Sequence, residues 1–405
     1  MSAKLVLEKK SLLYFLVMLP YFLPPGIYQI PVLNQLSVLK YLSLVVIAGY
    51  TIANQSLFLN QFVGSLFLFC IGLFALTFWR TDSIISLFKT ITDILVPALW
   101  IIGVYKLHRI NTLKILKNYL WVILLGNLLF MAAFPKGLTP NSELINAVYI
   151  LGDKNKIVIF LLPAMMLILI NINDSTLIYK RSISLYCVSI LTCYLANSTT
   201  SFLVIVCVIV LIEIALRWEF TKRIFTIRNC VIFIMIVAVA VLTGYLQHTV
   251  LWNQIARALN KSVNYSGRGT LWLQAIEKVK QSPIIGYGAV EAAYRDFSFF
   301  SSGSILTGFS THDGYLRLLL EGGIVELLLY INIYYTLAKK HLIRRKKNLT
   351  LISIIIAIVG MGVVFIFEAE YFSTMYILIL GIYWSEGRRN DGDYEQYNSQ
   401  IQNCV

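Results

Sequence analysis

Apolar stretches recur along almost the whole chain, and they constrain the fold more than any other feature. They come in blocks of roughly 17–23 residues, the length that a helix needs to cross a hydrocarbon core about 30 Å thick. Inside lipid every backbone N–H and C=O must find a partner within the protein, so such stretches form helices. The sequence therefore predicts an all-α fold, a polytopic bundle of transmembrane helices.

We place about twelve spans by taking the apolar runs in order. Their ranges are 11–25, 36–54, 57–79, 84–105, 118–134, 157–172, 183–196, 201–216, 230–247, 319–337, 349–367 and 371–384. No cleavage site of small residues follows the first run, so we expect it to be an anchor and not a removable signal peptide.

The composition and the placement of charge support this topology. Of 405 residues, 58% are hydrophobic and only 13% are charged, which excludes an ordinary soluble domain. The net charge of +14 does not indicate a nucleic-acid partner, because most basic residues cluster at the ends of apolar runs. If the N-terminus is inside, 21 of the 34 basic residues fall in segments predicted to be cytoplasmic, as the positive-inside rule requires. We therefore expect a multi-pass membrane protein with both termini in the cytoplasm.

The predicted organisation has four parts. Residues 1–247 carry spans one to nine, 248–318 form one long extracytoplasmic loop, 319–384 carry spans ten to twelve, and 385–405 form a cytoplasmic tail that we expect to be disordered. The long loop holds seven basic residues, which the topology allows because long loops translocate regardless of charge. A loop of this length is uncommon without a function, so we expect catalysis there.

Within the long loop, residues 271–281 have apolar side chains at helical spacing with charged residues between them. This pattern predicts a short amphipathic helix that lies on the membrane or on the bundle. Pro283 is expected to end it. The six cysteines form no C-x-x-C pair, and five lie in or beside apolar spans, so neither a disulfide framework nor a zinc site is expected.

Several short motifs follow one another in a fixed order. They are Asp153-Lys154-Asn155 before span six, Ser266-Gly267-Arg268 with Trp272, the P-x-x-G-x-G of Pro283, Gly286 and Gly288, His312-Asp313 with Tyr315, and Glu321-Gly322-Gly323. This ordered set, on this topology, resembles the O-antigen ligase and O-antigen polymerase family of bacterial membrane glycosyltransferases. The resemblance covers roughly residues 150–330 at the level of motifs and the whole chain at the level of topology.

The sequence departs from that family pattern at two places. The usual H-N is His312-Asp313 here, and the S-R turn after the seventh span is replaced by Asn197-Ser198-Thr199-Thr200-Ser201. The second change removes a cation that would otherwise face outward, and it puts that part of the site in question.

The resemblance implies a donor glycan on a polyprenyl diphosphate, a location in the bacterial cytoplasmic membrane, and no metal or other cofactor. It implies contact with membrane lipids and, as further partners, a flippase and a chain-length regulator. The expected activity is polysaccharide polymerisation of the O-antigen or capsule type. In this reaction a growing chain moves from polyprenyl diphosphate onto the next lipid-linked repeat unit at the outer face.

The chemistry of that transfer explains the residue types. A departing diphosphate gains negative charge, which preorganised cations stabilise, and arginine grips phosphate oxygens with a planar fork. Arg268 is therefore the first candidate for this clamp, followed by Arg317 and Lys154. The attacking hydroxyl needs a base, and His312 is the only histidine amid the motifs. We expect Asp313 or Glu321 to orient it, and Asn155, Asp313 and Glu321 to contribute to substrate binding.

Other interpretations of these residues remain open. Cations in an interfacial loop also meet lipid headgroups, and Gly286 and Gly288 are more readily explained as turn-forming residues than as ligand contacts. Trp272 suits the membrane interface as well as a sugar platform. Lys89 and Asp93 are spaced to pair on one helix face, whereas Glu213, Glu326, Glu368 and Glu370 are expected to reach water near span ends.

Two other functions also remain open. A ligase would move the finished glycan to a different acceptor, and one sequence does not separate that from polymerisation. A transporter of polysaccharide or lipid is the alternative from a different class. Transporters of this size usually carry broken helices and ionisable residues near the membrane midplane, and this sequence shows few such residues.

Overall fold

A computed structural model of the chain describes residues 3–78, 84–107, 109–138, 147–170, 175–218, 224–243, 249–250, 253–254, 257, 268–289, 296–301, 304–341 and 349–386. Ser266 and Gly267 of the predicted motif and residues 387–405 of the predicted tail lie outside these residues, whereas Ser385 and Glu386 belong to the last described helix. The main helices are α1 (Ala3–Phe22), α3 (Leu39–Ala53), α5 (Gln61–Phe78), α6 (Ile84–Leu107), α7 (Arg109–Ala133), α8 (Ile157–Ile170), α9 (Ser175–Leu195), α10 (Thr199–Arg217), α12 (Ile227–Leu242), α14 (Arg268–Gln281), α16 (Gly314–His341), α17 (Leu349–Phe367) and α18 (Thr374–Glu386).

Short elements complete the described fold. They are η1 (Pro25–Gln29), α2 (Pro31–Asn34), η2 (Gln35–Val38) and α4 (Gln55–Phe58), with two antiparallel hairpins, β1 (Val148–Tyr149) with β2 (Gly152–Asp153) and β3 (Phe297–Ser301) with β4 (Ser304–Phe309). Neither hairpin was predicted from the sequence.

The all-α prediction is otherwise confirmed, because each of the twelve predicted spans overlaps a helix. Four helical stretches in the described part of the chain are long and apolar enough to cross a membrane: 31–53, 61–78, 87–104 and 111–133. Shorter apolar helices of 10–17 residues lie at 10–22, 157–170, 182–195, 199–215, 227–242 and 351–367. The count of twelve spans stays a prediction.

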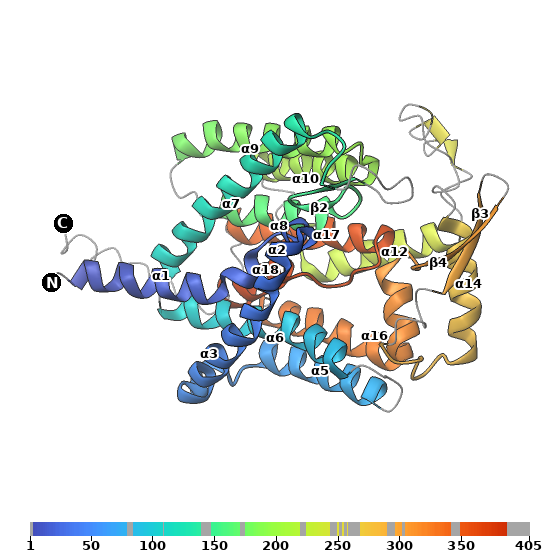
Figure 1. Ribbon diagram of the computed structural model, residues 1–405, viewed down its shortest axis with the longest axis horizontal. Coiled ribbons are helices and arrows are strands. Elements are labelled where there is room, and N and C mark those ends of the chain that lie inside the picture. Colours follow the sequence, from blue (N-terminus) through green and yellow to red (C-terminus); the bar gives the residue numbers. More distant parts are fainter. Residues whose placement is uncertain are drawn as a thin grey trace.

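The centre of the bundle is built from helices that are apolar on all sides. In Figure 1, α8, α17 and α18 lie between α9 and α10 on one side and α3 and α5 on the other. Almost every residue of α8 and α18 is buried, as expected for a helix without a polar face. On peripheral helices, by contrast, Leu42, Val45, Leu129 and Ile236 are more than 60% exposed. Such exposed apolar surfaces suit contact with lipid.

Helix α16 is interrupted at Gly323, and the P-x-x-G-x-G loop supplies hydrogen-bond partners to the backbone groups on both sides of the interruption. Gly323 has φ +61°, so the following amides, those of Ile324 and Val325, donate instead to the carbonyls of Pro283 and Ile284 at 2.9 and 3.2 Å. The amides of Tyr287 and Gly288 donate to the helix carbonyls of Leu320 and Glu321, each at 2.7 Å.

Gly286 and Gly288 have φ +57° and +84° in this loop. Both values lie in the left-handed region that favours glycine. A Cβ on Gly286 would approach the Leu320 carbonyl at 2.5 Å. The interpretation of these glycines as turn-forming residues is therefore confirmed.

The predicted amphipathic helix is present as α14, which packs on the bundle. Its apolar residues Leu271, Trp272 and Ala275 are buried in a cluster that includes Leu316 and Leu320 of α16. Trp272 is 2% exposed, so it is a packing residue rather than a marker of the membrane interface or an open sugar platform. This packing fixes the start of α14, where Arg268 lies, against the end of α17.

Candidate active site

A cavity of about 790 Å³ opens beside α10, α12 and α17. We call it the α10 cavity. Its walls include the apolar side chains of Leu203, Val206, Val210, Phe233, Val237 and Val363. Its polar end is formed by Lys154, Asn155, Arg268 and the turn from Asn197 to Thr200. The cavity thus combines a long apolar wall with a small cationic end.

The turn between α9 and α10 presents backbone donors to this cavity. Asn197 has φ +51°, a conformation that asparagine tolerates at the end of a helix. Ser198 follows as the N-cap of α10, but its hydroxyl contacts the Ser201 hydroxyl at 2.7 Å and caps no backbone amide. The amides of Thr199, Thr200 and Ser201 have no acceptor among the described residues. Free amides at a helix N-terminus favour an anion, so this turn supplies positive potential without a cationic side chain.

Arg268 is the first residue of α14, and its side chain is held by residues at the end of α17. Its Nη2 lies 3.3 Å from Glu368 Oε1, and its Nη1 donates to the Phe367 carbonyl. Both side chains of the ion pair are largely buried, at 15% and 2% exposed. Burial raises the pKa of Glu368 to about 7 even though Arg268 acts to lower it. A guanidinium has five N–H donors, so donors remain available to a ligand.

Lys154 and Asn155 reach the same cavity from the turn after β2. The amide of Lys154 donates to the Ala147 carbonyl at 3.1 Å, which fixes the turn. The ammonium group of Lys154 has no ion pair with any described residue. Three of the predicted site residues, Lys154, Asn155 and Arg268, are therefore brought together.

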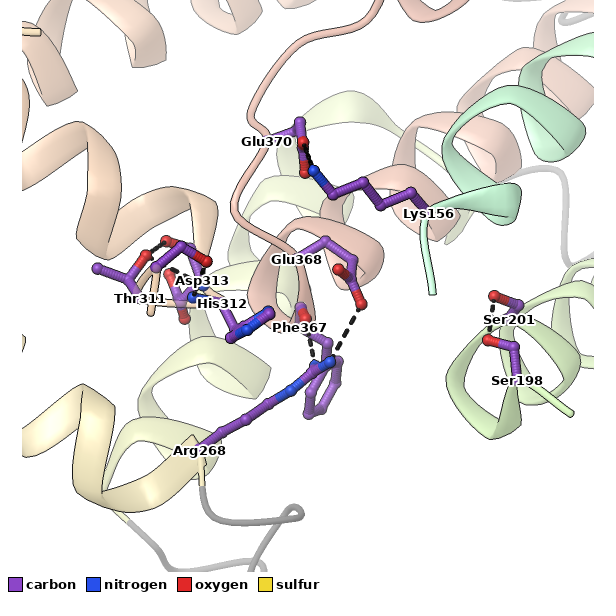
Figure 2. Close-up of polar contacts among 11 residues, drawn as sticks. Lys156, Ser198, Ser201, Arg268, Thr311, His312, Asp313, Phe367, Glu368 and Glu370 are labelled. Atoms are coloured by element: carbon purple, nitrogen blue, oxygen red, sulfur yellow. Dashed lines mark hydrogen bonds and ion pairs between the residues drawn. The ribbon is translucent and has the colours of Figure 1, made fainter. Parts of the chain in front are cut away.

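His312 occupies a conformation that few residues adopt. Its φ is +46°, and backbone outliers of this kind concentrate at functional sites. The imidazole is half-buried and has no hydrogen-bond partner among the described residues. Burial, and then the nearby charges of Arg268 and Lys156, lower the pKa of His312 to about 4. Figure 2 shows the imidazole beside Arg268 and Phe367.

The expectation that Asp313 or Glu321 orients His312 is wrong. Asp313 Oδ1 accepts from the Leu316 amide at 2.8 Å and thereby caps α16. Glu321 accepts from Arg317 Nε at 2.7 Å and from the Tyr371 hydroxyl at 2.5 Å. Both carboxylates are fully buried, so these contacts define structural roles.

Arg317 faces a second cavity of about 460 Å³, between α1, α3, α6 and the segment after α17. We call it the α3–α6 cavity. Lys156 pairs there with Glu370 at 2.6 Å, and Lys40 pairs with Asp93 at 2.8 Å. The predicted convergence of Arg317 with Arg268 is therefore not observed. The expected pairing of Lys89 with Asp93 is also wrong, because Asp93 binds Lys40 of α3 instead.

The acidic partners of the site were not predicted from the sequence. Glu368 and Glu370 were expected to reach water, yet they pair with Arg268 and Lys156. Glu326 was also expected to reach water, but it is fully buried in α16. The signal for Glu368 and Glu370 was their position directly after an apolar run, at the same predicted face as the basic loop.

The cavities group loop residues in the way that the predicted membrane topology requires. The loop residues that line the α10 and α3–α6 cavities, such as Lys154, Ser198, Arg268 and Glu370, were assigned to the outer face, and the other lining residues lie within predicted spans. A third cavity is lined by Asn60, Gln61, Lys339, Lys340 and Trp384, which were assigned near the cytoplasm. The grouping agrees with the predicted alternation of spans, and the assignment of sides stays a prediction.

Comparison with known proteins bears on the same region. Residues 184–331 match the family model described as O-antigen ligase, and no curated protein matches the sequence. The predicted resemblance is thus confirmed for a region that contains Arg268, His312 and the α9–α10 turn. Proteins of this family are membrane glycosyltransferase-like enzymes that act on lipid-linked oligosaccharides. Lys154, Lys156, Glu368 and Glu370 lie outside the matched residues.

Proposed function

We propose that the protein is a polysaccharide polymerase of the bacterial cytoplasmic membrane. It transfers a growing glycan from polyprenyl diphosphate to the sugar of the next lipid-linked repeat unit at the outer face. The observation that carries this proposal is the α10 cavity, which joins a long apolar wall to an end with two cations and free amides.

The two ends of the α10 cavity suit the two parts of such a donor. The apolar side chains of α10, α12 and α17 would contact the polyprenyl chain, because neither surface forms hydrogen bonds. Arg268, Lys154 and the amides of Thr199 and Thr200 would contact the diphosphate. A cation with a planar fork and a helix N-terminus are both common phosphate ligands.

Transfer forms one bond and breaks one bond at the anomeric carbon. The acceptor hydroxyl oxygen bonds to that carbon, while the bond from the carbon to the diphosphate oxygen breaks and its electron pair leaves with the diphosphate. The hydroxyl proton passes to His312. Arg268 stabilises the charge that develops on the leaving oxygen.

The low pKa of His312 has a consequence for this step. Without donor the imidazole is neutral and open to accept a proton, but its pKa of about 4 makes it a weak base. Arg268 is one of the charges that lower this pKa. A bound diphosphate would offset that charge and raise the pKa of His312, so the base becomes stronger when the donor is in place.

Transfer to a different acceptor is the second candidate, because the matching family model is described as O-antigen ligase. Both reactions use the same donor cavity and the same leaving group. They differ only in the acceptor.

The test uses purified full-length protein with the host's own lipid-linked repeat unit as the only substrate. A polymerase produces a ladder of products that differ by one repeat. A single transfer that requires another added acceptor would support the ligase instead. A protein that moves the lipid across a vesicle membrane without forming any glycosidic bond would be a transporter, and the proposal would fail.

A further inference from the structure

The α3–α6 cavity differs from the α10 cavity in the chemistry of its lining. Four cations line it, Lys40, Lys89, Lys156 and Arg317, together with the carboxylates of Asp93, Asp153 and Glu370. Glu321 is buried behind Arg317 and balances the fourth cation. The cavity therefore carries both signs of charge in nearly equal number, which suits a ligand that both donates and accepts hydrogen bonds.

Aromatic side chains hold the charged groups of this cavity in place. The Lys40 ammonium lies 5.0 Å from the centre of the Tyr21 ring and 5.6 Å from that of Tyr28. Its ion pair with Asp93 leaves the two side chains 18% and 34% exposed. Arg317 lies 5.4 Å from the Tyr371 ring centre. Such contacts restrict flexible side chains and keep donors and acceptors at fixed positions.

A saccharide matches this combination better than a diphosphate or a lipid chain does. Each sugar hydroxyl is both a donor and an acceptor, so it can bridge an ammonium and a carboxylate that lie side by side. The C–H faces of a sugar ring pack on aromatic rings such as those of Tyr28 and Phe372, which line the cavity. An ionised diphosphate, in contrast, only accepts hydrogen bonds and would offer no donor to the three carboxylates of the lining.

The cavity also lies where an acceptor must be. Two short segments line both cavities. In the turn after β2, Lys154 faces the α10 cavity and Lys156 faces the α3–α6 cavity. At the end of α17, Phe367 lines the α10 cavity, and Glu370, three residues later, lines the α3–α6 cavity. Figure 2 shows His312 beside Arg268, and the charge of Lys156 also acts on it, so the proposed base lies near a cation that lines each cavity.

We propose that the α3–α6 cavity binds the terminal saccharide of the acceptor, and that the Lys40–Asp93 pair and Lys89 select that sugar. The assignment of this saccharide as the acceptor rests on the proposed function. A hydroxyl of the bound sugar gives its proton to His312 and bonds to the anomeric carbon of the donor held in the α10 cavity. The residues that select the sugar lie in α3 and α6, outside the part of the chain that matches the family model.

The experiment measures saccharide binding without lipid or diphosphate. The probe is the repeat-unit oligosaccharide released from the host's lipid-linked repeat by mild acid. Its binding to full-length protein in lipid nanodiscs is followed by saturation-transfer NMR. Asp93→Asn should weaken binding about 10-fold or more, because it removes a charged hydrogen-bond acceptor. Lys89→Ala should weaken it by a smaller factor, and because the Lys89 side chain is exposed, this variant is expected to fold normally.

Two control variants complete the design. Lys280→Ala breaks an exposed Lys–Glu pair of α14 with a similar contact distance, 2.6 Å to Glu277, and should leave binding unchanged. Arg268→Ala should bind the oligosaccharide normally while losing affinity for polyprenyl diphosphate.

The outcomes separate this inference from the proposed function. No binding of the oligosaccharide, or equal binding by wild type, Asp93→Asn and Lys89→Ala, overturns the saccharide site whatever the activity assay shows. Loss of polyprenyl diphosphate binding in Asp93→Asn would assign the cavity to the donor and would also overturn it. Oligosaccharide binding that depends on Asp93 and Lys89 supports the site even if no polymer ladder forms, in which case only the proposed reaction fails.

Discussion

The α10 cavity and the α3–α6 cavity lie on either side of the same two segments, yet they carry opposite kinds of surface. The α10 cavity has an apolar wall and two cations, and none of the described residues in its lining carries a carboxylate. The α3–α6 cavity has a mixed lining of four cations, three carboxylates and several aromatic rings. A lipid diphosphate suits the first cavity and a hydroxyl-rich ligand suits the second.

The two cavities share a boundary, as expected if they hold the two substrates of one reaction. In the turn after β2, Lys154 and Asn155 line the α10 cavity, and Asp153 and Lys156 line the α3–α6 cavity. The salt bridges Arg268–Glu368 and Lys156–Glu370 fix the two sides of this boundary. Figure 2 shows both pairs at the end of α17 and the segment after it, with His312 near Arg268. Variants of single residues should therefore affect the donor and the acceptor separately.

The largest effect is expected for Arg268→Ala, which removes the cation proposed to stabilise the leaving group. Loss of a group that stabilises transition-state charge typically costs about 100- to 1000-fold in rate. Arg268→Lys should recover only part of the rate, because an ammonium does not reproduce the planar fork. The measurement is the initial rate of polymer formation by purified protein.

A double variant separates this effect from misfolding. Arg268→Ala alone leaves the Glu368 carboxylate buried without its partner, which is destabilising. Arg268→Ala with Glu368→Gln removes that charge and should restore the thermal stability but not the transfer rate. Recovery of the rate in the double variant would show that Arg268 acts only by pairing with Glu368.

A somewhat smaller loss, of about 100-fold, is expected when the imidazole of His312 is removed, as is typical for a general base. His312→Asn is the preferred variant, because asparagine tolerates the positive φ at this position. The affinity for polyprenyl diphosphate should change little. Unchanged polymer formation in His312→Asn would eliminate His312 as the base.

The pH dependence of transfer sharpens the same test. The base must be unprotonated, so the rate falls as the pH drops through the pKa of His312, which is about 4 without donor. A bound diphosphate should raise this pKa, so half-maximal rate should occur at a higher pH with saturating donor than with limiting donor. Glu368, whose pKa is about 7, also titrates. A transition that persists in His312→Asn and disappears in Glu368→Gln belongs to Glu368.

A modest effect is expected for Lys154→Ala. Lys154 lines the end of the α10 cavity proposed to bind the diphosphate, and a partly exposed charge contributes roughly 1 kcal/mol, or about 5-fold in affinity. The Michaelis constant for the lipid-linked donor should rise, while oligosaccharide binding stays unchanged. Lys136→Ala, at an exposed lysine of the same predicted outer loop, is the matched control. Equal effects of both variants would mean that Lys154 contributes only general surface charge.

The sequence predicted the helices well, because lipid leaves the backbone few alternatives. Each long apolar run became helical, and the spacing of Leu271 and Ala275 was sufficient to predict α14. The hairpin of β3 and β4 was missed because its strands are short and lie inside a loop.

The site was predicted less completely, because its contacts join distant parts of the chain. Arg268 and Lys154 were identified from short motifs, and both line the α10 cavity. Their surroundings were not, since Glu368 is 100 residues from Arg268. Local spacing was misleading for Asp93, which is four residues from Lys89 but turns toward Lys40, 53 residues away. Packing between helices decides such pairs.

The smallest effect concerns Asp313, where the predicted and observed roles differ most. As the cap of α16, its loss in Asp313→Ala should destabilise the protein by about 1 kcal/mol. Asp313→Asn keeps the oxygen that accepts from the Leu316 amide, so its stability should be at least that of the wild type. Thermal unfolding in detergent measures both. Reduced transfer by Asp313→Asn at normal stability would instead place the carboxylate in the chemistry.

The difference in stability between the wild type and Asp313→Asn should depend on pH, because Asp313 is buried. Burial raises the pKa of Asp313 to about 7, above its value of about 3.9 in an unfolded chain. Between these values the folded protein binds more protons than the unfolded chain, so the contribution of Asp313 to stability decreases as the pH rises from about 4 to 7. Asp313→Asn lacks this titration, and its stability relative to the wild type should therefore increase with pH over the same window. A constant difference between the two proteins would mean that Asp313 is already ionised in the folded state, and that the cap tolerates its charge.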